Sequence, residues 1–260
     1  MQIIIDKSVK IDFFPNTYKW LQQNPPSEYC LAQIKHYHCF VKRQKKRFQG
    51  WGLLVKAIGQ TQISHTPRVV SIAKSDDYYY FFTEKLDGIT LESYWKSKYP
   101  APKIDNLKNL VNSVYIAIYE INKLGFWYSD LCKKNVFYSQ PNKYFVIDID
   151  SCYPHSQIYF YDKVSFEYPP LLTEYARTAG GSHRFNLNGH SGECVNQAEL
   201  VAFAVDAKHN FHIPIDKKAK VLHTLLDNNH SLLYRKLFSG LMHGKPNWSE
   251  TKELLDQISK

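Results

Sequence analysis

The first third of the chain alternates short apolar runs with polar turns, a pattern typical of β-strands. It predicts two strand pairs and one short run near the start, at residues 2–5, 30–34, 37–41, 69–73 and 78–83. Ser75, Asp76 and Asp77 supply the turn between the last two strands. Apolar residues at helical spacing predict one helix over residues 47–58. We therefore expect this part of the chain to be rich in β-structure.

Further along, the apolar spacing changes to a helical period. Six apolar residues mark one face of a long helix: Leu107, Leu110, Val111, Val114, Ile118 and Ile121. Asp105 is its expected N-cap, and Gly125 is its expected stop. After a predicted hairpin and an irregular stretch, the remainder is expected to be mainly helical. The predicted hairpin strands are 136–138 and 144–147, and the predicted helices are 195–209, 217–227, 231–242 and 248–258.

The candidate chemistry lies around that hairpin. Asp130 stands five residues before Asn135, and the second hairpin strand leads to Asp148. Phosphoryl transfer from ATP requires a carboxylate that orients the attacking hydroxyl and oxygen ligands that hold magnesium on the phosphates. Asp130 is therefore the candidate catalytic residue. Asn135 and Asp148 are the candidate Mg²⁺ ligands, because Mg²⁺ prefers carboxylate and carbonyl oxygens.

This segment resembles the catalytic loop and the metal-binding strand of protein kinases. The family patterns H-R-D-x-x-x-x-N and D-F-G correspond here to Y-S-D-L-C-K-K-N and D-I-D. The resemblance implies an α+β, two-lobed protein-kinase-like fold with ATP and Mg²⁺ as cofactors. The β-rich N-lobe would cover residues 1–84, and the hinge with a mainly helical C-lobe would cover residues 85–260. Some similarity to lipopolysaccharide core kinases is also present.

The same resemblance implies further site residues. Residues 78–94 look like a strand, the hinge and a helix, so Glu84, Lys85 and Leu86 are candidates for binding adenine through their backbone groups. Lys42 corresponds to the strand lysine that contacts the phosphates. Lys134 stands where tyrosine kinases place an arginine, from which it can touch the transferring phosphate.

Several features of the family are missing. No Gly-rich loop precedes Gly50, and residues 29–75 contain no Asp or Glu that could pair with Lys42. Tyr128 and Cys132 replace the histidine and the lysine of the kinase loop. Two readings therefore stay open. One is an active kinase that acts on a protein Ser or Thr, or on a sugar hydroxyl. The other is a pseudokinase that binds nucleotide or protein.

Charge and cysteine content narrow the choice of partners. The 33 Lys and Arg residues against 24 Asp and Glu favour an anionic partner such as a nucleotide. Nucleic acid is not expected, because the basic run at 42–47 has no recognised nucleic-acid motif beside it. Five cysteines without a C-x-x-C pair indicate neither a disulfide framework nor a zinc site. Because no run approaches the ~20 apolar residues of a membrane span, we expect a cytoplasmic protein without a transmembrane segment.

Overall fold

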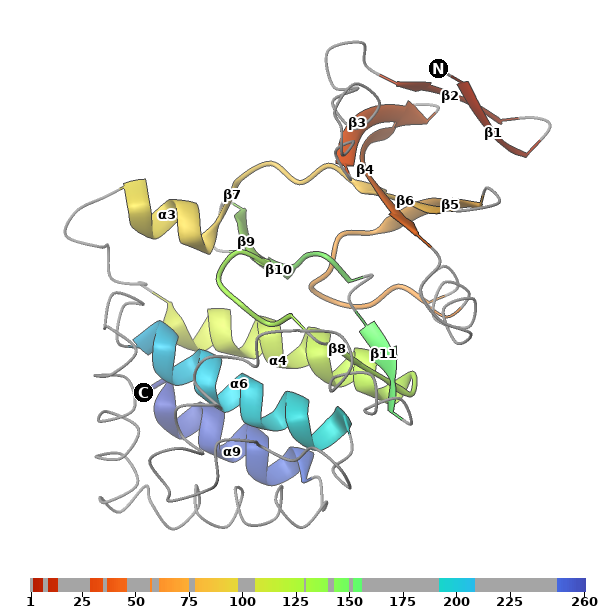
Figure 1. Ribbon diagram of the computed structural model, residues 1–260. Coiled ribbons are helices and arrows are strands. Elements are labelled where there is room, and N and C mark those ends of the chain that lie inside the picture. Colours follow the sequence, from red (N-terminus) through yellow and green to blue (C-terminus); the bar gives the residue numbers. More distant parts are fainter. Residues whose placement is uncertain are drawn as a thin grey trace. The chain divides into compact units, whose positions relative to one another are not determined.

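The computed structural model describes residues 2–6, 9–13, 29–34, 37–45, 57, 61–74, 78–97, 106–128, 130–139, 143–149, 152–155, 192–208 and 247–260. These residues form a mixed α and β structure with antiparallel sheets (Figure 1). They fall into two compact units, Met1–Asp87 and Gly88–Lys260. The mixture of α and β that the sequence predicts is thus confirmed.

The first unit contains one six-stranded sheet with the order β1-β2-β3-β4-β6-β5. Its strands are β1 (Gln2–Asp6), β2 (Val9–Phe13), β3 (Tyr29–Ile34), β4 (Tyr37–Lys45), β5 (Val69–Lys74) and β6 (Tyr78–Glu84). Both predicted strand pairs are confirmed, since β3 pairs with β4 and β5 pairs with β6. The sequence pattern did not predict β2. The turn predicted at 75–77 lies outside the described residues. So does the helix predicted over 47–58, apart from Ala57.

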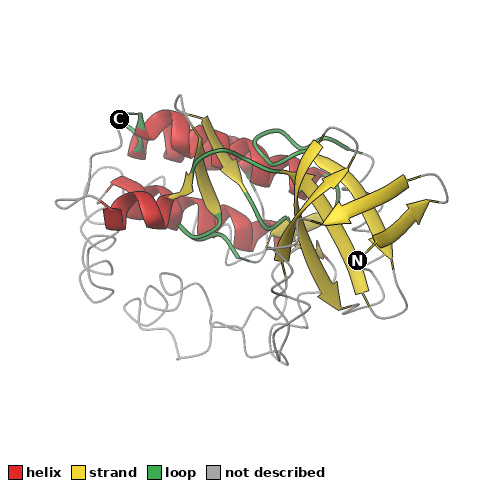
Figure 2. Ribbon diagram, turned by 90° about the horizontal axis from the view of Figure 1, so that it is seen from above, coloured by secondary structure: helices red, strands yellow, loops and turns green. Residues whose placement is uncertain are grey.

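The second unit contains every helix whose bounds the structure describes (Figure 2). The helices are α3 (Leu91–Ser97), α4 (Leu107–Lys123), α6 (Gly192–Lys208) and α9 (Trp248–Ile258). The strands are β7 (Ile89–Thr90), β8 (Phe126–Tyr128), β9 (Val136–Ser139), β10 (Lys143–Val146) and β11 (Cys152–Pro154). They form a three-stranded sheet β10-β9-β7 and a two-stranded sheet β11-β8. The helices α4, α6 and α9 pack against one another, as Figure 1 shows.

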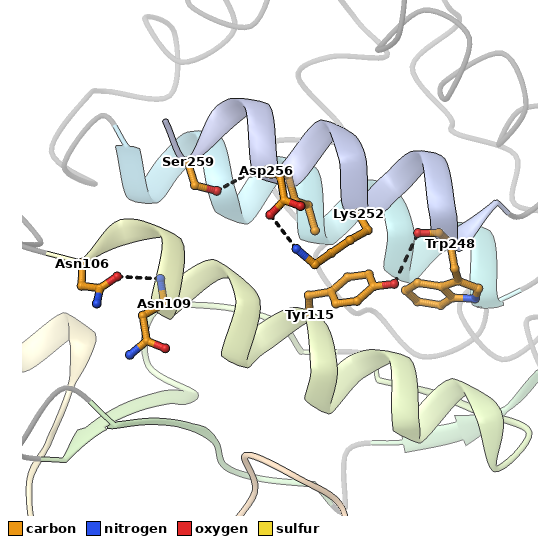
Figure 3. A network of polar contacts seen from close by, with 8 residues as sticks. Asn106, Asn109, Tyr115, Trp248, Lys252, Asp256 and Ser259 are labelled. Atoms are coloured by element: carbon orange, nitrogen blue, oxygen red, sulfur yellow. Dashed lines mark hydrogen bonds and ion pairs between the residues drawn. The ribbon is translucent and has the colours of Figure 1, made fainter.

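Helix α4 begins one residue later than the sequence predicts. Asn106, and not Asp105, is the N-cap, because its side-chain oxygen accepts a hydrogen bond from Asn109 N at 2.9 Å (Figure 3). Both residue types can cap a helix, so the choice between them depends on where the helix starts. The predicted stop is confirmed: Gly125 follows the C-cap Leu124 with a φ of 86°, a conformation that glycine adopts without steric cost.

The hairpin and two of the predicted helices are also confirmed. The predicted strands 136–138 and 144–147 are β9 and β10, which pair in antiparallel register. Helix α9 has the predicted bounds, whereas α6 begins three residues earlier than predicted. The turn at 140–142 and the helices predicted over 217–227 and 231–242 lie outside the described residues. The two-residue and three-residue strands β7, β8 and β11 are too short to show an alternating pattern.

An aromatic cluster fixes α9 against α4 (Figure 3). The Tyr115 hydroxyl donates a hydrogen bond to Trp248 O at 3.3 Å, and the Tyr119 ring stacks on Tyr115. The Trp248 ring meets both tyrosine rings edge-on. On α9 itself, Lys252 Nζ lies 2.5 Å from Asp256 Oδ1. The cluster therefore orients the final helix on the long helix that leads into the candidate loop.

Candidate functional site

Asp130 and Asn135 meet in the loop that joins β8 to β9. The Asn135 side-chain amide donates to Asp130 Oδ2 at 2.7 Å and to the Asp130 backbone oxygen at 3.0 Å. In the same loop, Asn135 N donates to Cys132 O at 2.9 Å. Because one partner is a carboxylate, the side-chain bond belongs to the stronger, charge-assisted class. The loop thus presents Asp130 at the surface with its carboxylate held by Asn135.

Asp148 directly follows Ile147, which is hydrogen-bonded to this loop. Ile147 N donates to Asn135 O at 2.9 Å, and the Tyr128 hydroxyl donates to Ile147 O at 2.8 Å. Asp148 itself has a φ of 62°. This left-handed conformation costs a non-glycine residue about 1–2 kcal/mol. Residues held in such conformations concentrate at functional sites, so the backbone supports a functional role for Asp148.

The donor atoms of this region fit a hard cation. The Asn135 amide nitrogen is used by Asp130, so the amide oxygen is the Asn135 side-chain atom suited to bind a metal ion. Asp148 adds a carboxylate, and one or two protein oxygens are what Mg²⁺ takes when phosphates and water complete its shell. No group of three or more His, Cys, Asp or Glu residues that could hold a metal ion occurs among the residues that the structure describes.

Helix α6 holds the start of this loop. Tyr128 N donates to Asn196 Oδ1 at 2.8 Å, and Asn196 Nδ2 donates to Tyr128 O at 2.6 Å. One buried side chain thus binds both backbone groups of a residue two positions before Asp130. The sequence analysis did not single out Asn196. In the sequence Asn196 is one of several polar residues of a predicted helix, with Gln197 and Glu199 close by, and solvent-exposed positions show the same pattern.

Two more polar side chains extend this network. Asn122 Nδ2 donates to Asn196 Oδ1 at 2.9 Å and to Ile118 O at 2.8 Å. His155 Nε2 lies 3.0 Å from Asn122 Oδ1 and 2.9 Å from Phe126 O. Both atoms are acceptors, so Nε2 of His155 carries a proton. The polar network of His155, Asn122, Asn196 and the Tyr128 backbone therefore joins α4, α6, β8 and the residue that follows β11.

The replacements for the kinase histidine and lysine remain uncharged near neutral pH. Burial, followed by the charges of Asp148 and Asp130, raises the pKa of Tyr128 well above its usual value. Burial, with a contribution from Asp130, raises the pKa of the Cys132 thiol to about 11. A cysteine side chain is neutral or negative in either protonation state, so Cys132 carries no positive charge of the kind that lysine has in the kinase pattern. Lys134 is exposed beside it and is the available cation.

The candidates in the first unit lie on β4, at the end of β6 and directly after it. Lys42 is half-buried and shares its face of β4 with the exposed Phe40, since Cys39 and Val41 on the opposite face are buried. The side chain of Arg43 lies outside the described residues. Lys42 pairs with Phe81 of β6 in the sheet register.

Two of the three expected adenine-binding residues use their N–H groups inside the sheet. Glu84 N donates to Arg68 O, and Lys85 N donates to His38 O, both at 2.9 Å. The Glu84 carboxylate accepts from Arg68 N at 3.0 Å. That Glu84, Lys85 and Leu86 bind adenine through their backbone groups stays a prediction.

No protein-family model matches the chain, and a search of curated proteins finds no match. Among the described helices, none is both long and apolar enough to cross a membrane. The interpretation of function therefore rests on the residues of the candidate loop and their contacts.

Proposed function

We propose that the protein is an ATP- and Mg²⁺-dependent phosphotransferase with a two-lobed, protein-kinase-like fold. The observation that carries the proposal is the double use of Asn135. The Asn135 side chain donates a hydrogen bond to the Asp130 carboxylate, and the Asn135 backbone oxygen accepts one from Ile147 N. Ile147 is the residue before Asp148. The catalytic candidate and both metal-ligand candidates are thereby linked by two hydrogen bonds. The favoured acceptor is a protein Ser or Thr hydroxyl, and a sugar hydroxyl is the alternative.

Each residue of the loop has a role in this proposal. Asp130 is exposed, so its carboxylate can accept a hydrogen bond from the acceptor hydroxyl and orient it for attack. Asn135 and Asp148 would hold Mg²⁺, which neutralises charge on the phosphates when it is bound. Lys134 would contact the transferring phosphate. Catalysis of this kind is positioning and charge stabilisation, which suits a loop held by hydrogen bonds on both sides.

The other ATP-binding candidates of the proposal lie in the first unit. Lys42 is the proposed phosphate contact and the N–H of Leu86 the proposed adenine contact. The basic character of the chain supports a polyphosphate ligand, because a net charge of +9 attracts anions. The missing Gly-rich loop leaves phosphate binding to side-chain cations.

Transfer of labelled phosphate from ATP in the presence of Mg²⁺ tests the proposal, with a mixture of Ser- and Thr-containing peptides and sugars as acceptors. Asp130→Asn keeps an oxygen for the Asn135 amide but removes the charge. We expect turnover to fall at least about a hundredfold with little change in nucleotide affinity, since orientation of the hydroxyl acts in the transition state. Asp148→Ala should weaken both turnover and Mg-ATP binding. Asp256→Asn, which removes a carboxylate from α9, is the matched control and should leave both unchanged.

Two results would change the interpretation. If folded Asp130→Asn protein transfers phosphate at the wild-type rate, the catalytic assignment is wrong. If wild-type protein gains thermal stability from Mg-ATP but transfers no phosphate to any acceptor, the pseudokinase reading replaces the enzyme.

A further inference from the structure

Helix α6 buries three polar side chains in the core of the second unit. Asn196 and Gln197 are fully buried, and Glu199 is 3% exposed. Gln197 has a clear structural use, because its Oε1 accepts from Asn247 N at the start of α9. Asn196 holds the Tyr128 backbone. Glu199 bonds to Asn196 through Oε2 only, although burial of an acidic side chain is costly unless its polar atoms are satisfied.

The side chain of Asn196 is fully used. Its oxygen accepts from Tyr128 N and from Asn122 Nδ2, and its nitrogen donates to Tyr128 O and to Glu199 Oε2. An amide side chain has two donor hydrogens and two acceptor lone pairs, so these four bonds exhaust its capacity. Glu199, which bonds to Asn196 Nδ2 at 2.8 Å, therefore accepts one of the two donor hydrogens of this amide.

The surroundings of Glu199 favour an uncharged acid. Its Oε1 is buried and has no hydrogen-bond partner among the residues that the structure describes. The charged group that acts on Glu199 is the carboxylate of Asp130, which follows β8. Tyr128 of β8 turns its hydroxyl to Ile147 O, and His155 reaches the network through Asn122. The buried faces of α4 and α9 add no titratable side chain there: Leu110, Val111, Ser113, Val114, Ala117, Ile118, Ile121, Asn122, Thr251, Leu254, Leu255 and Ile258.

A charged Glu199 would thus be surrounded by low-dielectric core, with one amide donor and the like charge of Asp130. Burial is accordingly the main cause that raises the pKa of Glu199 to about 8. A neutral acid keeps a carbonyl oxygen for Asn196. An ionised carboxylate would accept a stronger, charge-assisted hydrogen bond from Asn196 Nδ2, but it would also place an uncompensated charge in the core, which draws water in and disturbs the packing around Asn196.

We propose that Glu199, as a neutral carboxylic acid, is a positioning residue for the candidate catalytic loop. It orients the amide of Asn196, which holds both backbone groups of Tyr128, and this sets the place of Asp130 two residues later. The inference rests on the proposed function for its catalytic consequence. The geometric part, that Glu199 orders the loop, stands on the described contacts alone.

Two substitutions in the full-length protein test this role. Glu199→Gln keeps the shape and an acceptor oxygen and cannot ionise, whereas Glu199→Leu keeps a similar volume without any acceptor. Hydrogen exchange at Tyr128 N reports on the loop directly, because Asn196 is its acceptor. At pH 6.5 we expect wild type and Glu199→Gln to protect this amide equally, and Glu199→Leu to exchange at least about tenfold faster. Thr251 N, which bonds to Asn247 O in α9, should exchange at the same rate in all three proteins.

The pH profile separates positioning from packing. At pH 9, after correction for intrinsic exchange rates, wild type should lose protection of Tyr128 N at least about fivefold relative to Glu199→Gln. Phosphotransfer should fall by a similar factor in wild type and persist in Glu199→Gln, with the loss in kcat and not in the KM for ATP.

Equal protection of Tyr128 N in wild type and Glu199→Leu would overturn the proposal, as would pH profiles that coincide for wild type and Glu199→Gln. A uniform loss of protection across α6 and α9 in Glu199→Leu would mean a packing role only. If wild-type protein transfers no phosphate at all, the proposed function fails, and the exchange of Tyr128 N still decides whether Glu199 orders the loop.

Discussion

The buried acid of α6 should make the stability of the protein depend on pH in a way that one substitution removes. The pKa of Glu199 is raised from 4.5 to about 8, a difference of about 3.5 pH units, and burial is the largest cause. Each pH unit corresponds to about 1.4 kcal/mol. Ionisation of Glu199 at high pH should therefore lower the unfolding free energy by about 5 kcal/mol, compared with a side chain that does not titrate. Solvent screening does not reduce this free energy, because Glu199 is almost fully buried.

The sign follows from proton binding. Between pH 4.5 and about 8 the native protein holds a proton on Glu199 that the unfolded chain has released. Stability from this group is therefore fully present below pH 4.5 and decreases as pH rises, until the loss is complete above about pH 8. In Glu199→Gln the side chain binds no proton in either state, so this contribution is absent.

Urea unfolding at pH 5 and at pH 8.5, followed by tryptophan fluorescence and circular dichroism, measures the effect. We expect the unfolding free energy of wild type to fall by several kcal/mol more than that of Glu199→Gln over this interval. Such a loss is a large part of the 5–15 kcal/mol that stabilises a typical domain. Glu253→Gln, at an exposed position of α9, is the control and should follow wild type. Parallel curves for wild type and Glu199→Gln, within about 0.5 kcal/mol, would show that Glu199 is ionised in the folded protein and would refute the reasoning.

Three further results are expected. Asp148→Ala should melt at a lower temperature than Asp148→Gly, because only glycine adopts a φ of 62° without steric cost. Both variants should lose the thermal stabilisation by Mg-ATP. Equal melting temperatures of the two variants would argue against the left-handed backbone at Asp148. Gly192→Ala should lower the unfolding free energy in urea titrations by about 1–3 kcal/mol, because the new methyl group would lie 2.2 Å from the Trp127 ring. An unchanged midpoint of urea unfolding would contradict this close approach. Lys42→Ala should weaken ATP binding in calorimetry more than Arg43→Ala, and equal effects would mean that the basic run acts only as a diffuse field.

Several parts of the fold could be predicted because their signals are local. The strand pairs of the first unit show as short apolar runs separated by turns, and the length of α4 shows in its apolar face and in Gly125. The contact between Asp130 and Asn135 is also local, since both lie in one short loop. A five-residue spacing is enough for a loop to bring the two side chains together.

Other features depend on contacts that no local pattern records. Choosing Asn106 over Asp105 as the N-cap of α4 required the exact start of the helix, which packing decides. The pairing of β8 with β11 joins two three-residue segments that are separated by the hairpin. Neither segment is long enough to show the period of a strand, so the sequence offered no signal for the pair.

Local patterns of apolar and polar residues were thus enough to predict the type and order of the periodic elements and to select the residues of one candidate loop. Only the tertiary structure decided what holds that loop. Asn196 lies 68 positions after Tyr128, and in the sequence it and Glu199 are polar residues of a helix, as solvent-exposed ones are. Their burial between α4, β8 and α9 makes Asn196 the side chain that binds Tyr128 and makes Glu199 a partner of Asn196, because a buried polar side chain must find its partners inside the protein.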